Sequence, residues 1–256
     1  MNLKRESDEK IAVFGGTFDP FTVAHRDICK QAMDKLPIDK LYVIPSVVSY
    51  HRVEKGSWLS DSERVWCIKE MLCTLGADYL GKWEVDETEI KLKAVCNWYD
   101  ENDTRNENRH FELGFLWESI IKPRRFLHTL LDFKSRVGMW KQILLILGTD
   151  EVMDFTKWYH WEDVARLVSG IVLVNGRDGQ KTEIPKEVQE KVSGYSCSLE
   201  LSDSLLSLVS ASRVRETCKH WAFSTDNYMD EVRFFDTGQA SLNMLGWTRK
   251  EGANNG

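Results

Sequence analysis

The sequence lacks the features that mark membrane-spanning, secreted and metal-clustered proteins. No apolar run approaches the roughly 20 residues that a membrane-spanning helix needs. The six cysteines include no C-x-x-C pair and no spacing typical of metal ligands, so we expect buried or partly buried thiols in a reducing compartment. The first ten residues are polar and charged, without the apolar centre of a signal peptide. Together these absences predict a cytoplasmic protein.

An excess of positive charge is also missing. The chain has 34 lysine and arginine residues against 40 aspartate and glutamate residues, which gives a net charge of −6. This balance argues against a broad surface for polyanions, so we expect neither nucleic acid nor a membrane as a partner, although local basic residues could hold a small phosphorylated ligand. With 256 residues and an ordinary hydrophobic fraction of 42%, the chain is long enough for one substantial core.

Apolar runs typical of strands alternate with helical patterns, which indicates a parallel sheet covered by helices on both faces. We expect strands over residues 11–14, 40–45, 83–92, 142–147 and 171–174, and helices over residues 26–36, 60–72, 111–121, 126–133 and 209–221. The predicted fold class is α/β, a Rossmann-like doubly wound sheet in a single domain over residues 1–256, with its core in 11–222. Residues 95–122 are expected to be an insertion whose polar loop, 95–109, forms a flap, and the tail 250–256 is expected to be disordered.

The most informative stretch is residues 15–25, which read G-G-T-F-D-P-F-T-V-A-H. The paired glycines, Gly15 and Gly16, end the first strand, and the next helix begins close to His25. A helix N-terminus presents unpaired backbone N–H groups and the positive end of the helix dipole, which together favour phosphate. The histidine adds a side-chain donor at the same point. The spacing is neither the dinucleotide fingerprint G-x-G-x-x-G nor a P-loop, so it predicts another kind of phosphate site.

Polar residues also follow three other predicted strands, at 46–52, 148–150 and 175–177. In open parallel sheets, ligands bind beyond the carboxyl ends of the strands, near the point where the strand order reverses. If these strands are all parallel, the polar groups share one edge of the sheet with residues 15–19. That convergence predicts a binding site at this edge.

Two blocks of sequence resemble the motifs of one enzyme superfamily. Residues 15–25 resemble the G-T-F-D-P-x-T-x-G-H signature of nucleotidyltransferases, which join a phosphate to the α-phosphorus of a nucleoside triphosphate. Residues 209–215, V-S-A-S-R-V-R, resemble the I-S-S-T-x-I-R motif of the same superfamily. The resemblance implies that ATP is bound by Gly15, Gly16, Thr17, Phe18, His25, Gly148, Asp150, Ser210, Ser212 and Arg215.

The middle of the chain narrows the resemblance to the nicotinate-nucleotide adenylyltransferases. Residues 147–150, L-G-T-D, followed by Trp158, look like the G-x-D-then-W pattern of that family, in which the tryptophan stacks on the pyridine ring of the mononucleotide. Trp161 is expected to be a core residue, and Arg64 matches the arginine of an S-x-x-x-R segment. The resemblance covers residues 11–222 and implies mononucleotide binding by Arg52, Thr129, Asp150, Trp158 and Arg177.

Two positions depart from the family pattern. Ala24 replaces the glycine that usually precedes the histidine, and Ala211 replaces a serine. Neither change removes a charged group, although Ala24 could constrain the backbone where phosphate approaches. The histidines other than His25 and His51 are expected to be surface or core residues, and we expect no metal site built by the protein alone.

The resemblance implies that a mononucleotide and ATP give a dinucleotide and pyrophosphate without a covalent enzyme intermediate. His25 would contact the α- or β-phosphate and stabilise the transition state, and Thr22 would contribute a hydroxyl. Arg215, with Ser210 and Ser212, would hold the phosphates that leave as pyrophosphate. Mg²⁺ would arrive with ATP, held mainly by phosphate oxygens and water.

Other interpretations stay open on the sequence alone. Pantetheine-phosphate adenylyltransferases carry a similar first motif, but the 148–158 block and the chain length argue against that activity. A cytidylyltransferase fits less well, because its R-T-x-G-I-S-T-T block is missing. A catalytically idle nucleotide-binding regulator would keep the fold, although the presence of His25 and Arg215 argues against it. The sequence also leaves open the choice between the acid and amide mononucleotide and the formation of a homo-oligomer.

Overall fold

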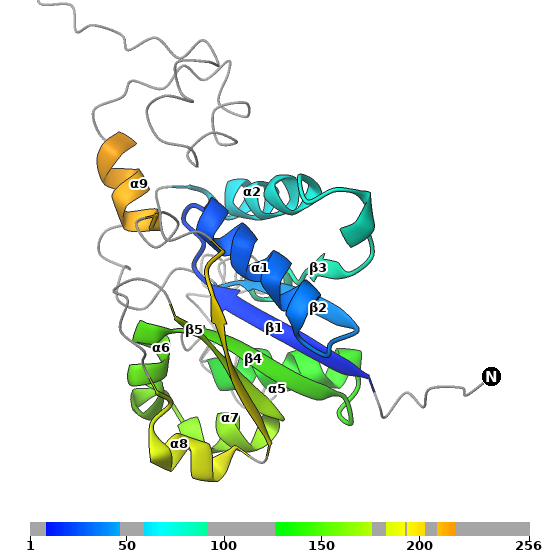
Figure 1. Ribbon diagram of the computed structural model, residues 1–256, viewed down its shortest axis with the longest axis vertical. Coiled ribbons are helices and arrows are strands. Elements are labelled where there is room, and N and C mark those ends of the chain that lie inside the picture. Colours follow the sequence, from blue (N-terminus) through cyan, green and yellow to red (C-terminus); the bar gives the residue numbers. More distant parts are fainter. Residues whose placement is uncertain are drawn as a thin grey trace, which may run out of the picture.

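The computed structural model describes residues 9–46, 59–91, 126–175, 183–192, 194–202 and 209–218. Six strands in these ranges form one sheet in the order β3-β2-β1-β4-β5-β6, and every adjacent pair is parallel (Figure 1). The strands are β1 (Lys10–Gly16), β2 (Lys40–Pro45), β3 (Trp83–Val85), β4 (Gln142–Gly148), β5 (Gly170–Asn175) and β6 (Tyr195–Glu200). This order is that of Rossmann-type doubly wound sheets, with its reversal between β1 and β4, so the predicted fold class is confirmed.

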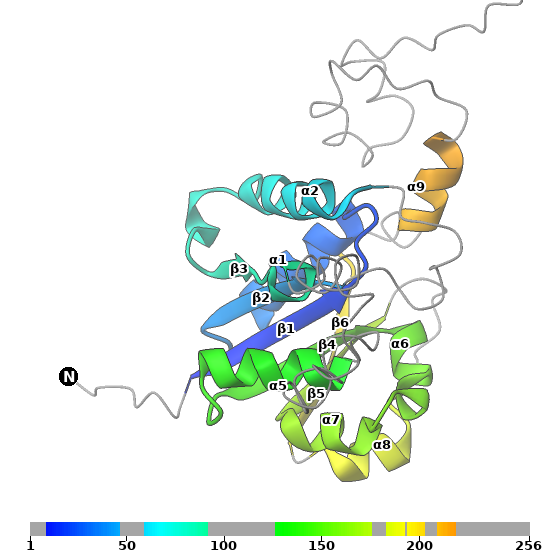
Figure 2. The same cartoon turned by 180° about the vertical axis from the view of Figure 1, so that it is seen from behind.

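Helices cover both faces of the sheet. The α-helices are α1 (Val23–Lys35), α2 (Asp61–Cys73), α5 (Phe126–Val137), α6 (Thr149–Met153), α7 (Trp161–Leu167), α8 (Lys186–Lys191) and α9 (Ala211–Cys218), and two 3₁₀ helices are η3 (Ala77–Tyr79) and η5 (Phe155–Lys157). α1 and α2 lie on one face, and α5, α7 and α8 lie on the other (Figures 1 and 2). Strand alternation explains this layering, because Ala12 and Phe14 pack with α1 and α2, whereas Ile11 and Val13 pack with α5 and α7.

The start of α2 follows from its local sequence. Ser60 Oγ accepts a hydrogen bond from the Glu63 backbone N–H at 3.3 Å, and Glu63 Oε2 accepts one from the Ser60 N–H at 2.7 Å. These reciprocal bonds form a capping box, which satisfies backbone donors that the first helical turn leaves unpaired. The helix start predicted from the spacing of these two residues is confirmed.

One predicted strand is much shorter than expected. The alternating pattern predicts a strand over residues 83–92, but β3 ends at Val85 and residues 88–91 form a helical turn. Asp86 ends the strand, because its Oδ1 accepts a hydrogen bond from the Thr88 backbone N–H at 2.9 Å and starts that turn. Arg136 Nη2 donates to the other oxygen, Oδ2, at 2.7 Å and fixes the carboxylate against α5.

The other expectations have mixed outcomes. The remaining predicted strands are observed with small changes of their ends, whereas β6, α6, α7 and α8 were not predicted. Cys29 and Cys67 are buried as expected, but Cys73 is exposed. The predicted helix 111–121, the insertion 95–122 with its loop 95–109, and the tail 250–256 lie outside the described residues. In the part of the chain that the structure describes, no helix is both long and apolar enough to span a membrane.

Candidate active site

The candidate site lies at the carboxyl end of the sheet. Gly16 at the end of β1 pairs with Pro45 of β2, and Gly148 at the end of β4 pairs with Val174 of β5. The segments that follow these strands therefore leave the sheet at the same edge, and α6 and α9 lie at that edge as well (Figures 1 and 2). The convergence predicted from parallel strands is observed for the described members of each group, which exclude residues 47–52 and 176–177.

The loop between β1 and α1 has a constrained backbone. Phe18 adopts the left-handed region with a φ of 48°, which is uncommon for a residue with a bulky side chain. A Cβ on Gly16 would lie 2.8 Å from Cε1 of the Phe18 ring, so this conformation requires glycine at position 16. The Phe18 ring is 4% exposed and packs edge-on against Phe14 and Phe21, with ring centroids 5.2 Å apart in each pair. Aromatic packing thus holds the loop in a shape that brings its backbone to the helix start.

His25 is the third residue of α1, and its ring orientation is fixed by the residue that caps the helix. Its Nδ1 atom lies 2.9 Å from the Thr22 backbone N and 3.0 Å from Thr22 Oγ1. Because a backbone N–H can only donate, Nδ1 accepts, and the ring proton is on Nε2. The imidazole lies among aromatic rings, with centroid distances of 5.3 Å to Phe18, 5.3 Å to Phe21 and 6.1 Å to Phe14. The site therefore offers one ring donor in a defined tautomer.

Arg64 joins the segments that follow β1 and β2. The side chain is fully buried, and its Nη1 donates to the carbonyl oxygens of Thr17 at 2.5 Å and Ser46 at 2.8 Å. Its Nη2 donates to Asp61 Oδ1 at 2.6 Å, which supplies the opposite charge. Residue 17 follows β1 and residue 46 follows β2, so one guanidinium sets the relative position of both strand ends. The sequence indicated Arg64 only through its family resemblance, without this linking role.

The two sequence blocks come together at the sheet edge. Arg215 Nη1 donates a short hydrogen bond to the Asp19 carbonyl oxygen, across 196 residues of chain, and its Nη2 donates to Ser212 Oγ at 3.0 Å. Ser210 lies directly before α9, where its Oγ accepts from the Arg213 backbone N–H at 3.2 Å. Ser210 is thus a helix cap, and α9 presents Ser212 and Arg215 to the β1–α1 loop.

Aromatic residues on the face of the sheet that α5 and α7 cover also approach the end of β1. Trp158 is half-buried and contacts the rings of Phe126 and Phe155, with centroids 5.3 Å and 4.9 Å away. Phe126 in turn approaches the beginning of residues 15–25, because a Cβ on Gly15 would lie 3.4 Å from the Cε2 atom of Phe126. The sequence reasoning missed Phe126, whose only signal is its place three residues before Thr129. Trp161, expected in the core, is also half-buried and lies farther along, 6.3 Å from Phe155.

The remaining predicted binding residues differ in their accessibility. Thr129 is 4% exposed, and its hydroxyl donates to Glu89 Oε2 at 2.8 Å, where Glu89 is itself buried. Asp150 is exposed in the first turn of α6, and Gly148 precedes that helix as its N-cap residue. Arg52 and Arg177 lie outside the described residues.

No metal cage is apparent among the described residues, and two of the described cysteines are buried. No three histidine, cysteine or carboxylate side chains gather there in a way that could hold a metal ion. Burial raises the pKa of the Cys67 thiol to about 12 and raises the pKa of Cys29 as well. Both thiols are therefore protonated at neutral pH and are poor nucleophiles.

Sequence comparison places the chain among nucleotidyltransferases. The model of the family described as cytidylyltransferase-like matches residues 13–217. The chain is 26% identical over 178 residues to the "Probable nicotinate-nucleotide adenylyltransferase" of Aliarcobacter butzleri, a match that covers 70% of this chain and 77% of that protein. It is 30% identical over 182 residues to the protein of the same name from Campylobacter fetus, again with 70% and 77% covered.

Structural comparison agrees with the fold. The chain is similar to the Plasmodium falciparum nicotinic acid mononucleotide adenylyltransferase complexed with NaAD, with a TM-score of 0.57, 13% identity, and coverage of 94% of this chain and 98% of that one. The same parasite enzyme complexed with APC gives a TM-score of 0.52 at 12% identity, with the same coverage. At these identities the likeness shows the doubly wound fold.

Proposed function

The chain belongs to the cytidylyltransferase-like family and, within it, to the nicotinate-nucleotide adenylyltransferases, and from this premise we propose that it transfers the adenylyl group of ATP to nicotinate or nicotinamide mononucleotide. Pyrophosphate is the second product, and the reaction is the adenylylation step of NAD biosynthesis. The observation that carries the proposal is the contact of Arg215 with the Asp19 carbonyl, because it joins the two blocks to which we assign phosphate binding, residues 15–25 and residues 209–215.

The geometry around His25 supports a role in stabilising the transition state. The mononucleotide phosphate attacks the α-phosphorus of ATP, and negative charge collects on the phosphate oxygens as the bond to the leaving group breaks. Because Nδ1 accepts from the Thr22 backbone N–H, the ring proton is on Nε2, and His25 donates this proton to those oxygens in the proposed transition state. Thr22 is 1% exposed, so its part in catalysis is to orient His25. The first turn of α1 adds the positive end of its dipole.

The rest of the proposed site divides between the two substrates. Arg215 and the hydroxyls of Ser210 and Ser212 bind the β- and γ-phosphates, for which a planar guanidinium is well suited. The backbone of residues 15–18, with Gly148 and Asp150, holds the remainder of ATP. Mg²⁺ brought by ATP would be held mainly by phosphate oxygens and water and would neutralise part of the phosphate charge. The mononucleotide is bound by Arg52, Thr129, Asp150, Trp158 and Arg177.

An assay of pyrophosphate release tests the proposal directly. Purified protein is given ATP and Mg²⁺ with nicotinate mononucleotide, nicotinamide mononucleotide or phosphopantetheine, and CTP replaces ATP in a parallel series. Release with a pyridine mononucleotide and ATP supports the proposal, and the ratio of kcat/KM between the acid and the amide gives the substrate preference. Release only with phosphopantetheine, or only with CTP, overturns it. Tight ATP binding without release in any mixture identifies a regulator.

A further inference from the structure

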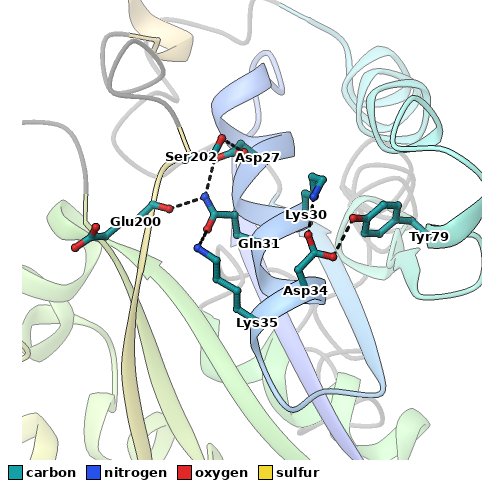
Figure 3. A network of polar contacts seen from close by, with 8 residues as sticks. All are labelled: Asp27, Lys30, Gln31, Asp34, Lys35, Tyr79, Glu200 and Ser202. Atoms are coloured by element: carbon teal, nitrogen blue, oxygen red, sulfur yellow. Dashed lines mark hydrogen bonds and ion pairs between the residues drawn. The ribbon is translucent and has the colours of Figure 1, made fainter.

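Helix α1 forms two separate polar networks on its two sides (Figure 3). On one side, Asp27 and Gln31 reach the end of β6. On the other side, Asp34 accepts from Lys30 Nζ at 2.6 Å and from Tyr79 Oη at 2.9 Å, next to η3. Both networks begin on the same helix, but only the first leads toward the chain segment that carries Ser210 and Arg215.

The Asp27 carboxylate is the centre of the first network. Its Oδ2 accepts from the Ser202 backbone N–H at 2.8 Å, and its Oδ1 accepts from Ser202 Oγ at 2.5 Å. Gln31 Nε2 donates to Oδ2 at 3.1 Å. Three donors on one carboxylate fix its orientation, and hydrogen bonds to a charged acceptor are stronger than neutral ones.

Gln31 extends the same network to the last residue of β6. Its side chain is 5% exposed, and Nε2 also donates to the Glu200 carbonyl oxygen at 2.6 Å. Because the Asp27 carboxylate and the Glu200 carbonyl can only accept, the amide must point its nitrogen at both, and its oxygen accepts from Lys35. Helix α1 is therefore bound to both residue 200 and residue 202, where the chain leaves the sheet.

The place of this network in the chain connects it to the site. Asp27 lies two residues after His25, and Ser210 lies eight residues after Ser202. β6 is an edge strand, so its exit is fixed by β5 on one side only. At the far end of the same segment, Arg215 is bound to the Asp19 carbonyl. Ser202 is thus bound to α1, and Arg215 of α9 is bound to the loop that precedes α1.

We propose that Asp27, with Gln31 as its support, is a positioning residue for ATP, an inference that rests on the proposed function. Its carboxylate joins Ser202, just after β6, to the helix that carries His25, and Ser210, Ser212 and Arg215 follow Ser202 within 13 residues of sequence. In the proposed function the phosphates of ATP contact both blocks, so the affinity for ATP depends on the distance between the two blocks. Trp158, which is assigned to the mononucleotide, packs in the core cluster on the other face of the sheet.

Steady-state kinetics of Asp27→Ala and Asp34→Ala test the proposal. The two variants remove a carboxylate with hydrogen-bond partners from the same helix, but only Asp27 is bound to the β6 exit. We expect Asp27→Ala to raise the KM for ATP about tenfold, as for loss of about one charged hydrogen bond, with the KM for the mononucleotide changed less than twofold. Asp34→Ala should leave both constants unchanged. Asp27→Asn, which keeps one acceptor oxygen, should restore most of the ATP affinity.

Two further measurements keep the test decisive. If Asp27→Ala does not fold, Ser202→Ala removes the Oγ donor from an exposed residue, and we expect about a threefold rise in the KM for ATP. An unchanged ATP constant in the folded variants, or an equal rise in Asp34→Ala, overturns the inference while wild-type turnover leaves the proposed function standing. Failure of the wild type to release pyrophosphate overturns the proposed function, and calorimetric titration of MgATP into wild type, Asp27→Ala and Asp34→Ala then decides the positioning role by itself.

Discussion

The two ends of the parallel sheet use buried polar side chains for different purposes. At the carboxyl end, Asp19, Thr22 and Arg64 are buried and hydrogen bond to loop backbone or to His25. At the amino end, Lys134 is the buried cation, and its Nζ donates to the carbonyl oxygens of Lys141 at 3.3 Å and Leu167 at 3.1 Å. The first group orders segments that a ligand would contact. Lys134 instead binds the carbonyl of the last residue of α7 and that of the residue before β4.

The difference follows from the direction of the chain. In a parallel sheet of this kind, the helices begin near the carboxyl ends of the strands, so backbone N–H groups face that edge and favour anions. The helices end near the amino ends of the strands, where carbonyl groups are left unpaired and favour a cation such as Lys134. Polar groups at the two edges therefore have opposite chemistry, and mutations at the two edges should differ in whether they affect activity or stability.

The largest expected effect is on turnover, from His25→Ala. Removing the Nε2 donor should lower kcat by about 100-fold or more, the usual cost of one preorganised donor to a transition state. The Michaelis constants should change much less, because the donor acts where charge develops. Stopped or continuous pyrophosphate assays measure this loss, with His160→Ala as a control on an exposed histidine. Near-normal turnover by His25→Ala would remove the catalytic role assigned to this end of the sheet.

The next largest effect should come from Arg64→Met, which tests whether a buried cation at the carboxyl end serves both stability and binding. The change leaves the Thr17 and Ser46 carbonyls without their donor, and we expect a loss of about 2–3 kcal/mol in the free energy of unfolding. Urea unfolding measures it. In the folded protein the Michaelis constants for both substrates should rise, since the ends of β1 and β2 lose their common anchor. A stable variant with unchanged constants would contradict the linking role.

How much of this site the sequence predicts depends on whether a residue acts locally. The capping box from Ser60 to Glu63 and the placement of His25 at a helix start depend on neighbours within a few residues, and both predictions are confirmed. The strand over 83–92 was overestimated, because alternation of apolar and charged residues continues past Asp86, whose side chain starts a turn. The alternating pattern cannot distinguish a strand that continues past Asp86 from one that ends there, because a single side-chain hydrogen bond decides between the two.

Long-range partners could not be predicted from spacing. The contacts of Arg64 with Ser46, of Arg215 with Asp19 and of Asp27 with Ser202 join residues that only the sheet order brings together. β6 was missed although its sequence, Y-S-C-S-L-E, alternates apolar and polar residues as a strand with one buried face does. The resemblance supplied the identity of Arg215 as a site residue, but the partner that orients it became visible only in the fold.

A smaller effect on activity is expected from Trp158→Ala. Loss of stacking on the pyridine ring should weaken mononucleotide binding by about 1–3 kcal/mol, the usual scale for one aromatic–base stack, with ATP binding nearly unchanged. Trp161→Ala is the matched control, because its ring centroid lies farther from that of Phe155, at 6.3 Å against 4.9 Å for Trp158. Mononucleotide titrations followed by tryptophan fluorescence or calorimetry give both constants. If Trp158→Ala unfolds the protein and Trp161→Ala alone loses mononucleotide affinity, the two rings have exchanged roles.

The smallest effect should come from the amino end, through Lys134→Met. Burial lowers the pKa of the Lys134 ammonium below its ordinary value of 10.5, so the unfolded chain binds this proton more tightly than the folded one. The charged Lys134 therefore lowers the free energy of unfolding of the wild type at neutral pH. This loss of stability is relieved as the pH rises from the pKa of Lys134 in the folded protein toward 10.5. At pH 7 the loss of two hydrogen bonds and the relief of a buried charge oppose each other, and we expect a net change within about 1 kcal/mol. Urea unfolding at pH 7 and pH 10 should therefore show the wild type gaining stability relative to Lys134→Met as the pH rises, while kcat and both Michaelis constants match the wild type at pH 7. A loss of turnover in a stable Lys134→Met protein would show that the amino end also shapes the site and would break the division between the two ends.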